Sequence, residues 1–354
     1  MELKELGFNE WFQQRLNEYG NTICQIARVT NVSRGGYLVR SKDDEVLSEL
    51  AGEFAFSVES KVEYPVVGDW AFVRYYNDST LAIIYDLLPR KTILRRKVAD
   101  KAVDYQVIVA NVDIAFIIQS CDLNFNPRRL ERYMVMAKDG QVDPVILLSK
   151  SDLVSPRELE SKISEIRNSG INCKVIAYSV ETGSGLSEIQ LLLQPGMTYC
   201  LLGSSGVGKT TLLNHLIGRE EFEVTPVREK DSKGRHTTSG RQLVVLDNGA
   251  MLIDNPGMRE LGNIDIESGI DEHFSDIIEL SGSCRFSDCT HTHEAGCSVL
   301  EAVRSGSLSE AHYQNYLKLI KETEYNQMSY LEKRRKNRKF GQYVKSVMKR
   351  RKKK

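Results

Sequence analysis

Eight consecutive residues match the full pattern of a phosphate-binding loop, G-x-x-x-x-G-K-[ST]. They are Gly203, Ser204, Ser205, Gly206, Val207, Gly208, Lys209 and Thr210. Glycines at these positions let backbone N–H groups curl around phosphate oxygens at a helix N-terminus, and the lysine reaches the terminal phosphates as a catalytic group. The Thr210 hydroxyl suits Mg2+, and we extend the predicted nucleotide site to Thr211. Apolar runs on both sides of the loop give the strand–loop–helix context that a chance match would lack.

A second polar loop, Ser149-Lys150-Ser151-Asp152, indicates which base the nucleotide carries. The carboxylate of Asp152 would accept hydrogen bonds from N1–H and the exocyclic amino group of guanine, a donor pair that adenine lacks. The stem of Lys150 would cover the base, and Ser179 would lie in the loop behind it. Guanine-specific GTPases usually have Asn where this chain has Ser149, so we expect weaker guanine affinity. An ordinary polar turn after a strand is the alternative for this loop. The missing Asn also leaves an ATP-using P-loop enzyme as a rival function.

Two further segments have the composition of nucleotide-sensing switches. Asp254 follows a strand-like run, where a carboxylate can hold Mg2+ through water, and the N–H of Gly257 can sense the γ-phosphate. The polar loop Gly234–Gly240 lies between the P-loop and this segment, and its threonine would complete the Mg2+ coordination. We assign that role to Thr238, although the sequence does not distinguish it from Thr237. The nucleotide is therefore expected to bind with Mg2+.

The order of these motifs predicts a circularly permuted domain. Ras-like GTPases run from P-loop to switches to guanine loop, whereas here the guanine loop comes first. The predicted strands are Asp113–Gln119, Val145–Leu148, Cys173–Tyr178, Met197–Leu202 and Met251–Ile253, and the predicted helices are Pro127–Asp139, Arg157–Asn168 and Leu186–Leu193. This alternation is typical of a parallel sheet with ligands at the strand carboxyl ends. Circular permutation preserves a fold readily when the termini of the domain lie close together.

Three cysteines and a histidine form the pattern C-x4-C-x-H-x5-C within fourteen residues, and they are Cys284, Cys289, His291 and Cys297. Such a set suits a closed tetrahedral Zn2+ site, and four protein ligands leave no open position for catalysis. We therefore predict one structural Zn2+, with His293 as the alternative nitrogen ligand. The other cysteines, Cys24, Cys121, Cys173 and Cys200, are scattered among apolar runs and are interpreted as core residues.

Charge is distributed unevenly along the 354 residues, although the formal net charge is zero. Residues 331–354 hold 13 Lys and Arg against one acidic residue, which leaves 35 basic and 47 acidic residues in the rest. A dense basic tail neutralises phosphates and indicates an RNA partner, and a merely solubilising tail is the alternative. The chain has neither an 18-residue apolar run nor a signal peptide, so we expect a cytoplasmic protein without membrane contact.

The first ninety or so residues contain short strand-like runs and no catalytic constellation. The runs are Ile23–Thr30, Gly36–Arg40, Val66–Tyr75 and Leu81–Leu88. They predict a small barrel, either an OB-fold or an SH3-like one. The residues able to supply charge and stacking to RNA are Arg28, Arg34, Arg40, Lys42, Arg74, Tyr75 and Tyr76. Pro89–Lys97 is interpreted as the linker to the next domain.

Taken together, these motifs closely resemble a bacterial family of circularly permuted enzymes, the ribosome small-subunit-dependent GTPase A family. The resemblance covers nearly the whole chain and rests on the permuted order, the P-loop, Gly234–Thr238, Asp254–Gly257 and the cysteine cluster. This chain departs from the family at Ser149, at Asn255 where Thr is usual, and at Ala295 where Pro is common.

The resemblance implies a multidomain fold. An N-terminal all-β OB-fold would cover residues 1–95, a circularly permuted α/β GTPase domain 96–266, a mostly α zinc-binding domain 267–330 and a basic tail 331–354. It also implies hydrolysis of GTP to GDP and phosphate, stimulated by the small (30S) ribosomal subunit through its 16S rRNA, late in maturation of that subunit. We expect a monomer. A GTP-dependent RNA clamp, in which hydrolysis is incidental, is the alternative.

Ras-like enzymes orient the attacking water with a glutamine, and this chain has Met258 at that position. A methionine cannot orient water, so we expect slow GTP hydrolysis by the protein alone. The resemblance implies that His236, in the first switch, takes part in catalysis once the ribosomal subunit is bound. From the residues alone, a solvated loop histidine is the alternative.

Overall fold

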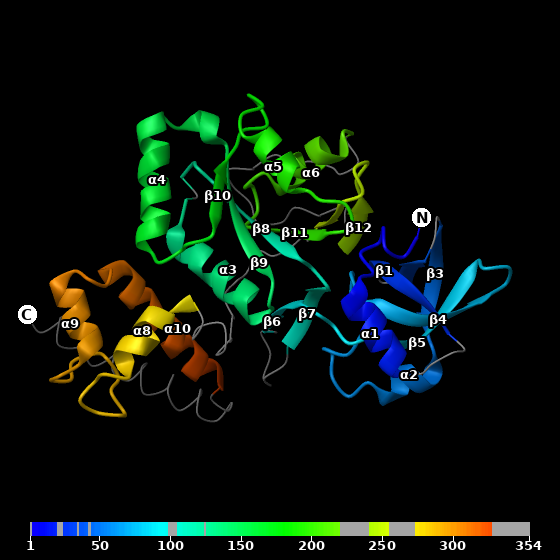
Figure 1. Ribbon diagram of the computed structural model, residues 1–354, viewed down its shortest axis with the longest axis horizontal. Coiled ribbons are helices and arrows are strands. Elements are labelled where there is room, and N and C mark those ends of the chain that lie inside the picture. The colour runs from blue at the N-terminus through cyan, green and yellow to red at the C-terminus, as the bar shows by residue number, and fades with distance from the viewer. Residues whose placement is uncertain are drawn as a thin grey trace, which may run out of the picture.

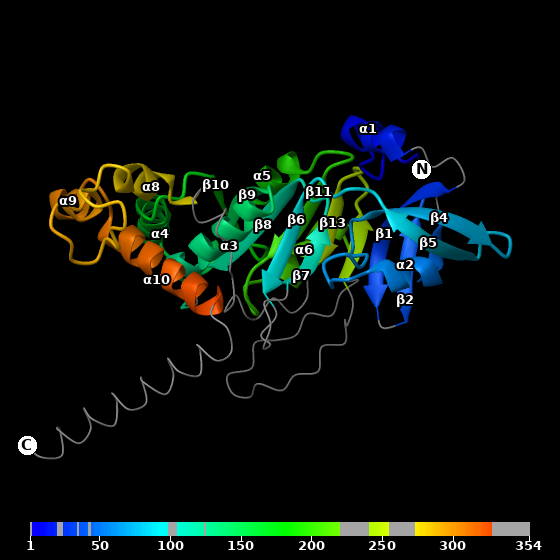
Figure 2. The same cartoon turned by 90° about the horizontal axis from the view of Figure 1, so that it is seen from below.

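The computed structural model describes residues 2–19, 24–33, 35–41, 44–97, 105–123, 125–219, 241–254 and 273–327. Three parts follow one another in space: a small barrel near the N-terminus, a central sheet flanked by helices, and a helical region formed by the last described residues (Figures 1 and 2). Within the described residues, no helix has both the length and the apolar content needed to span a bilayer.

The N-terminal part is a closed five-stranded barrel. Its strands are β1 (Gln25–Ser33), β2 (Gly36–Arg40), β3 (Glu45–Leu50), β4 (Trp70–Tyr76) and β5 (Leu81–Leu87). They pair in the order β1-β2-β3-β5-β4, and β4 returns to β1 to close the barrel. The β3–β5 pair is parallel and the others are antiparallel, which is the connectivity of an OB-fold. The sequence predicted four of these strands and missed β3.

Two short helices accompany the barrel, α1 (Glu10–Tyr19) and α2 (Gly52–Ser57). Phe12 of α1 packs with Phe8 against Trp70 of β4, with the Phe8 and Trp70 rings edge to face and 4.9 Å apart. The barrel is also joined to the central sheet, because β1 pairs antiparallel with β12 (Arg241–Val245). One sheet of eleven strands therefore runs through both parts.

Arg28 of β1 is buried at this junction and is 1% exposed. Its guanidinium donates to Thr198 Oγ1 at 2.9 Å, to Asn111 O at 3.1 Å and to Leu6 O. It also lies over the Trp70 ring, 5.3 Å from the centroid. The prediction that Arg28 faces RNA is therefore wrong, since its charge is used to join the barrel to the central domain.

We expect Arg28→Ala to lower the free energy of unfolding by about 3 kcal/mol, because three buried oxygen acceptors lose their cationic donor. Chemical denaturation monitored by tryptophan fluorescence measures the change. The control is Arg15→Ala, which removes an exposed pair with Glu18 and should cost about 0.5 kcal/mol or less. A loss below about 1 kcal/mol for Arg28→Ala would contradict a structural role.

The central domain is a parallel sheet with one antiparallel strand, β12, next to the barrel. Its parallel strands are β8 (Ile114–Ser120), β9 (Asp143–Ser149), β10 (Lys174–Ala177), β11 (Thr198–Leu202) and β13 (Met251–Asp254), in the order β10-β9-β8-β11-β13-β12. Its helices are α3 (Pro127–Asp139), α4 (Pro156–Asn168), α5 (Leu186–Leu192) and α6 (Lys209–Ile217), with a 3-10 turn η1 (Ser151–Leu153). These elements confirm the predicted alternation and its parallel sheet.

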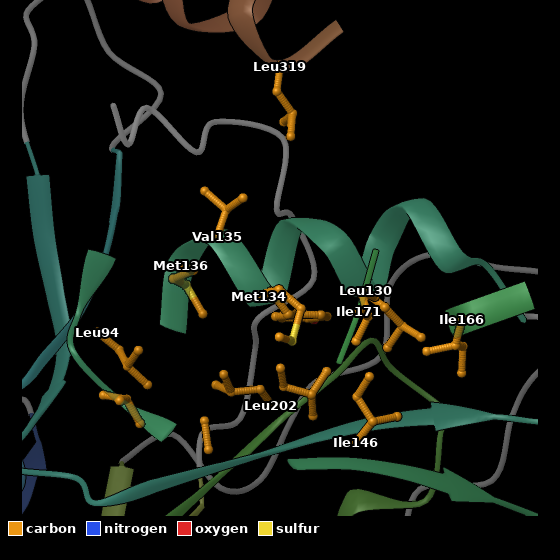
Figure 3. Packing of buried hydrophobic residues seen from close by; sticks show 14 of the residues in the cluster. Leu94, Leu130, Met134, Val135, Met136, Ile146, Ile166, Ile171, Leu202 and Leu319 are labelled. Carbon is orange, nitrogen blue, oxygen red and sulfur yellow. The ribbon is translucent and has the colours of Figure 1, made fainter. Parts of the chain in front are cut away.

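Alternating strand residues supply two separate cores, one on each face of the sheet. Ile146 and Leu202 pack beneath α3 and α4, whereas Leu147 and Leu201 pack with α5 and α6 on the other face. Figure 3 shows the first core, with Leu130, Met134 and Met136 of α3 pointing toward the strands. Burial on both faces explains why these strands are continuous apolar runs in the sequence.

The segment predicted as a linker contains a strand instead. Residues Ile93–Lys97 form β6, which pairs antiparallel with β7 (Tyr105–Ala110) in a separate two-stranded sheet. Of its basic residues, Arg95 forms an ion pair with Asp139 of α3 at 3.1 Å, and Arg96 donates to Gln106 of β7. Its pairing partners lie 8 to 17 residues further along the chain, which is why the local composition did not reveal a strand.

The last described part is helical, as the family resemblance implied, with α8 (Ser275–Ser281), α9 (Ser298–Ser305) and α10 (Glu310–Gln327). It packs against α3, and Figure 3 shows Leu319 of α10 facing Val135 on the side of α3 that points away from the sheet. The carboxyl ends of the parallel strands remain clear of this contact and carry the site described next.

Candidate functional site

The predicted phosphate loop connects β11 to α6, so its backbone lies at the carboxyl end of the central strand of the sheet. Gly203 adopts a φ of +153°, and a Cβ there would lie 2.5 Å from the carbonyl oxygen of Ile118. Gly208 caps α6 with a φ of +91°. Both positions need glycine, the first for space and the second for conformation. The loop therefore places N–H groups at a helix N-terminus, which is an arrangement for binding phosphate.

Lys209 closes this loop from within. Its ammonium donates to the carbonyl oxygens of Gly203 and Ser204, both at 2.8 Å. Burial lowers the pKa of Lys209 to about 8, and the negative charge of Asp254 only partly opposes the shift. The residue is therefore a cation at neutral pH, and a phosphate oxygen could replace the two carbonyls as its partner.

The lowered pKa of Lys209 predicts a pH dependence of nucleotide affinity. Below pH 8 the Lys209 side chain of the free protein is already a charged ammonium. Above pH 8 it is mostly neutral, so nucleotide binding must be accompanied by protonation of the amine, which weakens the affinity. We expect the dissociation constant for GDP to rise about fourfold between pH 7 and pH 8.5, with no comparable change between pH 6.5 and pH 7. Titration with a fluorescent GDP analogue measures this. Lys209→Ala should bind more weakly and show a flat profile, and a flat profile in the unaltered protein would contradict the assignment.

The guanine loop follows β9 and is tied to the phosphate loop by a buried hydrogen bond. Ser149 is 2% exposed, and its hydroxyl donates to the carbonyl oxygen of Val207 at 2.6 Å. The side chain thus holds the two loops together. Lys150 adopts a left-handed φ of +56°, and its ammonium lies 2.9 Å from Asp122. Asp152 lies in η1 and is exposed, so its carboxylate is open to a ligand.

The neighbouring strand ends complete this edge of the sheet. Ser179 follows β10 and is buried, and its hydroxyl accepts a hydrogen bond from the N–H of Thr182 at 3.3 Å. Asp254 ends β13 and is 6% exposed. Thr210 and Thr211 open α6 and are partly buried. The ends of four strands, β9, β10, β11 and β13, therefore carry every predicted nucleotide residue that the structure describes.

Four predicted positions of the nucleotide site lie outside the described residues, namely Thr237, Thr238, His236 and Gly257, and so does Met258 of the second switch. The candidate RNA contacts Arg34 and Lys42 of the N-terminal part also lie outside them.

Two polar residues at this edge were missed by the sequence analysis. Asp122 follows β8 and accepts hydrogen bonds from Ser120 Oγ at 2.7 Å and from Lys150. Arg129 of α3 donates to Ser204 Oγ of the phosphate loop at 2.8 Å. Asp122 could have been found from the sequence, because it closely follows a buried parallel strand. Arg129 could not, because its contact with Ser204 joins residues 75 positions apart.

The four residues of the cysteine cluster meet in the C-terminal region. Their ligand atoms, from Cys284, Cys289, His291 and Cys297, all lie within 4.8 Å of one another. Cys284 Sγ is 3.8 Å from Cys297 Sγ and 3.6 Å from His291 Nδ1. His293, the alternative ligand, is exposed, and its Nδ1 contacts Thr292 Oγ1 instead. Cys297 also begins α9, and its sulfur accepts a hydrogen bond from the N–H of Leu300.

These distances suit a tetrahedral Zn2+. Zn–S bonds of about 2.3 Å at tetrahedral angles place two sulfur atoms about 3.8 Å apart. The observed sulfur separation of 3.8 Å matches this, and the sulfur–nitrogen distance of 3.4 Å between Cys297 and His291 is also compatible. The donor set therefore fits a structural zinc site with no open position.

Comparison with known proteins gives concordant results. A family model described as RsgA GTPase matches residues 87–264. A protein named small ribosomal subunit biogenesis GTPase RsgA 2, from Vibrio parahaemolyticus, is 38% identical over 98% of this chain and 92% of its own length. Another protein of that name, from Lactiplantibacillus plantarum, is 39% identical over 89% of each chain.

Solved structures agree with the fold. The crystal structure of YjeQ from Thermotoga maritima aligns with a TM-score of 0.62 and 27% identity, over 85% of this chain and 99% of that one. The crystal structure of YloQ, described as a circularly permuted GTPase, aligns with the same TM-score over 88% and 99% of the two chains, at 24% identity. The predicted permutation is therefore consistent with both sequence and fold.

Proposed function

The chain belongs to the RsgA GTPase family and is a GTP hydrolase, and from this we propose that it acts in the maturation of the small ribosomal subunit. The names of its relatives support this partner. The observation that carries the nucleotide assignment is the buried Ser149–Val207 hydrogen bond, which joins a base-reading loop and a phosphate loop into one site. Stimulation of hydrolysis by the subunit, late in its maturation, is part of the proposal.

We assign the site as follows. Residues 203–211 bind the phosphates, and Lys209 stabilises charge on the terminal phosphate during transfer. The base is bound by residues 149–152 and Ser179, with Asp152 choosing guanine. Thr210, Thr238 and Asp254 would hold Mg2+ with the nucleotide, and the ion would supply positive charge to the phosphates. Gly257 senses the γ-phosphate, and His236 takes part in hydrolysis on the ribosome.

The metal of the C-terminal region is proposed to be one structural Zn2+, held by the three cysteines and His291. Its surroundings support a purely structural role. Tyr313 of α10 donates from its hydroxyl to the carbonyl oxygen of His291 at 2.6 Å, so the cluster is connected to the helix that packs on α3. A zinc ion there would fix the loop 284–297 beneath that helix.

The barrel, the C-terminal region and the basic tail 331–354 are proposed to contact 16S rRNA. On the barrel, Arg74 lies over the ring of Tyr85, 4.7 Å from the centroid, and the Tyr85 hydroxyl is 2.8 Å from that of Tyr76. Tyr76 is 39% exposed, so it can stack on an unpaired base while the arginine contacts phosphate. We propose domain limits of 1–95, 96–266, 267–330 and 331–354, and a monomer in the cytoplasm.

Sedimentation with isolated small ribosomal subunits tests the partner. The full chain is expected to pellet with small subunits when loaded with a non-hydrolysable GTP analogue and to be released in GDP. Large ribosomal subunits serve as the control, because they also expose rRNA phosphates but are not the proposed partner. Equal binding to both subunits, or binding indifferent to the nucleotide, would contradict the proposal and favour a non-specific RNA clamp.

A further inference from the structure

Helix α3 touches the phosphate loop at its N-terminal end. The side chain of Asn126 caps the helix by accepting from the N–H of Arg129. The Arg129 guanidinium then reaches Ser204 Oγ at 2.8 Å, within the loop that Gly203 begins. A cation is thus held beside the phosphate cradle by a capped helix rather than by a loop.

The opposite side of α3 bears a buried acid that faces the C-terminal region. Glu131 is 1% exposed, and its carboxylate lies 3.9 Å from Nδ1 of His312, which is 2% exposed at the start of α10. The other ring nitrogen of His312 is 3.3 Å from the carboxylate of Asp276 on α8. One imidazole therefore lies between a carboxylate of the GTPase domain and one of the C-terminal region.

The charge state of this cluster follows from its neighbours. Burial alone would lower the pKa of His312, but its hydrogen bond with Asp276 and the negative charges of Asp276 and Glu131 raise that pKa to about 9. His273, whose ring is 5.9 Å away, has its pKa lowered to about 4 by burial and by the charge on His312. At neutral pH His312 is therefore the cation of the cluster, and His273 is neutral.

The contact around the cluster is close-packed. A Cβ added to Gly170, in the loop after α4, would lie 2.8 Å from the His312 ring. Figure 3 shows Val135, which lies one turn after Glu131 on α3, facing Leu319 of α10. A close-packed and charge-paired contact transmits displacement instead of absorbing it.

We propose that Arg129 is a positioning residue for the phosphate loop, and that the Glu131–His312–Asp276 cluster couples the C-terminal region to nucleotide affinity through α3. The two contacts are two residues apart on one helix, so movement of α10 relative to Glu131 also moves Arg129. This rests on the proposed nucleotide site and adds to it a route by which a partner bound at the C-terminal region changes nucleotide affinity. Coupling of this kind is reciprocal, so nucleotide also stabilises the α3–α10 contact.

A double-mutant cycle on the full chain, with a fluorescent GDP analogue as the probe, tests the proposal. Arg129→Ala is expected to weaken affinity about tenfold, the size expected for one hydrogen bond from a charged group. His312→Gln should weaken it about threefold, and the double variant should resemble Arg129→Ala alone, because His312 acts through Arg129. Arg129→Lys, which keeps a cationic donor, should recover most of the affinity.

Controls separate this result from loss of fold. Gln314→Ala removes an exposed bond to Glu310 on the same helix and should leave affinity unchanged. If His312→Gln does not fold, Asp276→Asn takes its place, since Asp276 is 51% exposed. The proposal would be overturned if the double variant lost affinity by the product of the two single losses, about thirtyfold. It would also be overturned if Arg129→Ala bound the GDP analogue as tightly as the unaltered protein. Failure of the unaltered protein to bind GDP would instead overturn the nucleotide site itself.

Discussion

An Asp152→Asn variant is expected to bind GTP roughly a hundredfold more weakly or worse, because two hydrogen bonds to a charged acceptor are lost. The same variant should gain affinity for xanthosine triphosphate. Xanthine has a carbonyl where guanine has its exocyclic amino group, and an asparagine amide can donate to it. Asp152 is exposed in η1 at the end of β9, so the exchange leaves the fold intact.

Competition of the two nucleotides against a fluorescent GDP analogue measures the exchange. Glu160→Gln, which removes an exposed negative charge from α4, is the matched control and should preserve the preference for guanine. Equal weakening of both nucleotides by Asp152→Asn would show that this carboxylate supports the loop without choosing the base. If Asp152→Asn kept the preference for GTP, the guanine base would have to bind away from Asp152.

Removal of zinc is expected to unfold the C-terminal region while leaving the GTPase sheet folded. Binding of a structural Zn2+ contributes on the order of 10 kcal/mol in small zinc domains, far more than the few apolar residues of α8 and α9 supply. Cys297 is both a proposed ligand and the cap of α9, and His291 holds Tyr313 of α10. Loss of the metal therefore removes the start of one helix and the anchor of another.

A matched pair of histidines tests the zinc ligands. His291→Ala is expected to lose the metal and the helical signal of this region, whereas His293→Ala should keep one zinc per chain, because its ring points to Thr292. Zinc released on thiol modification measures the content, and hydrogen exchange of residues 284–313 reports the folding. Retention of zinc by His291→Ala, or its loss from His293→Ala, would contradict the assignment.

Local motifs made much of the site predictable. The phosphate loop, the guanine loop and the cysteine cluster are each contained within fourteen residues or fewer, so residue type and spacing are sufficient to find them. The central strands were predictable because burial on both faces makes them continuous apolar runs. Strand β3, with two glutamates and a serine among six residues, lacks such a run and was missed.

Tertiary contacts explain what the sequence could not reveal. Arg28 looks like a surface arginine until β1 is placed against β12, and only then do Thr198 and Asn111 become its acceptors. Ser149 is proposed to line the base site, and the residue types alone gave no sign that its hydroxyl also donates to the carbonyl oxygen of Val207, 58 residues away. In the sequence, Arg129 and Glu131 are two charged residues of an ordinary amphipathic helix. Only the structure shows that Arg129 contacts the phosphate loop and that Glu131 faces His312.

Phosphate release from GTP, measured with and without isolated small ribosomal subunits and with ATP in parallel, tests the central claim most directly. We predict slow release from GTP by the protein alone, a large increase when small subunits are added, and none from ATP. Lys209→Ala should remain inactive under both conditions, which excludes a contaminating hydrolase. Equal turnover of ATP, or GTP turnover that small subunits do not change, would contradict the account.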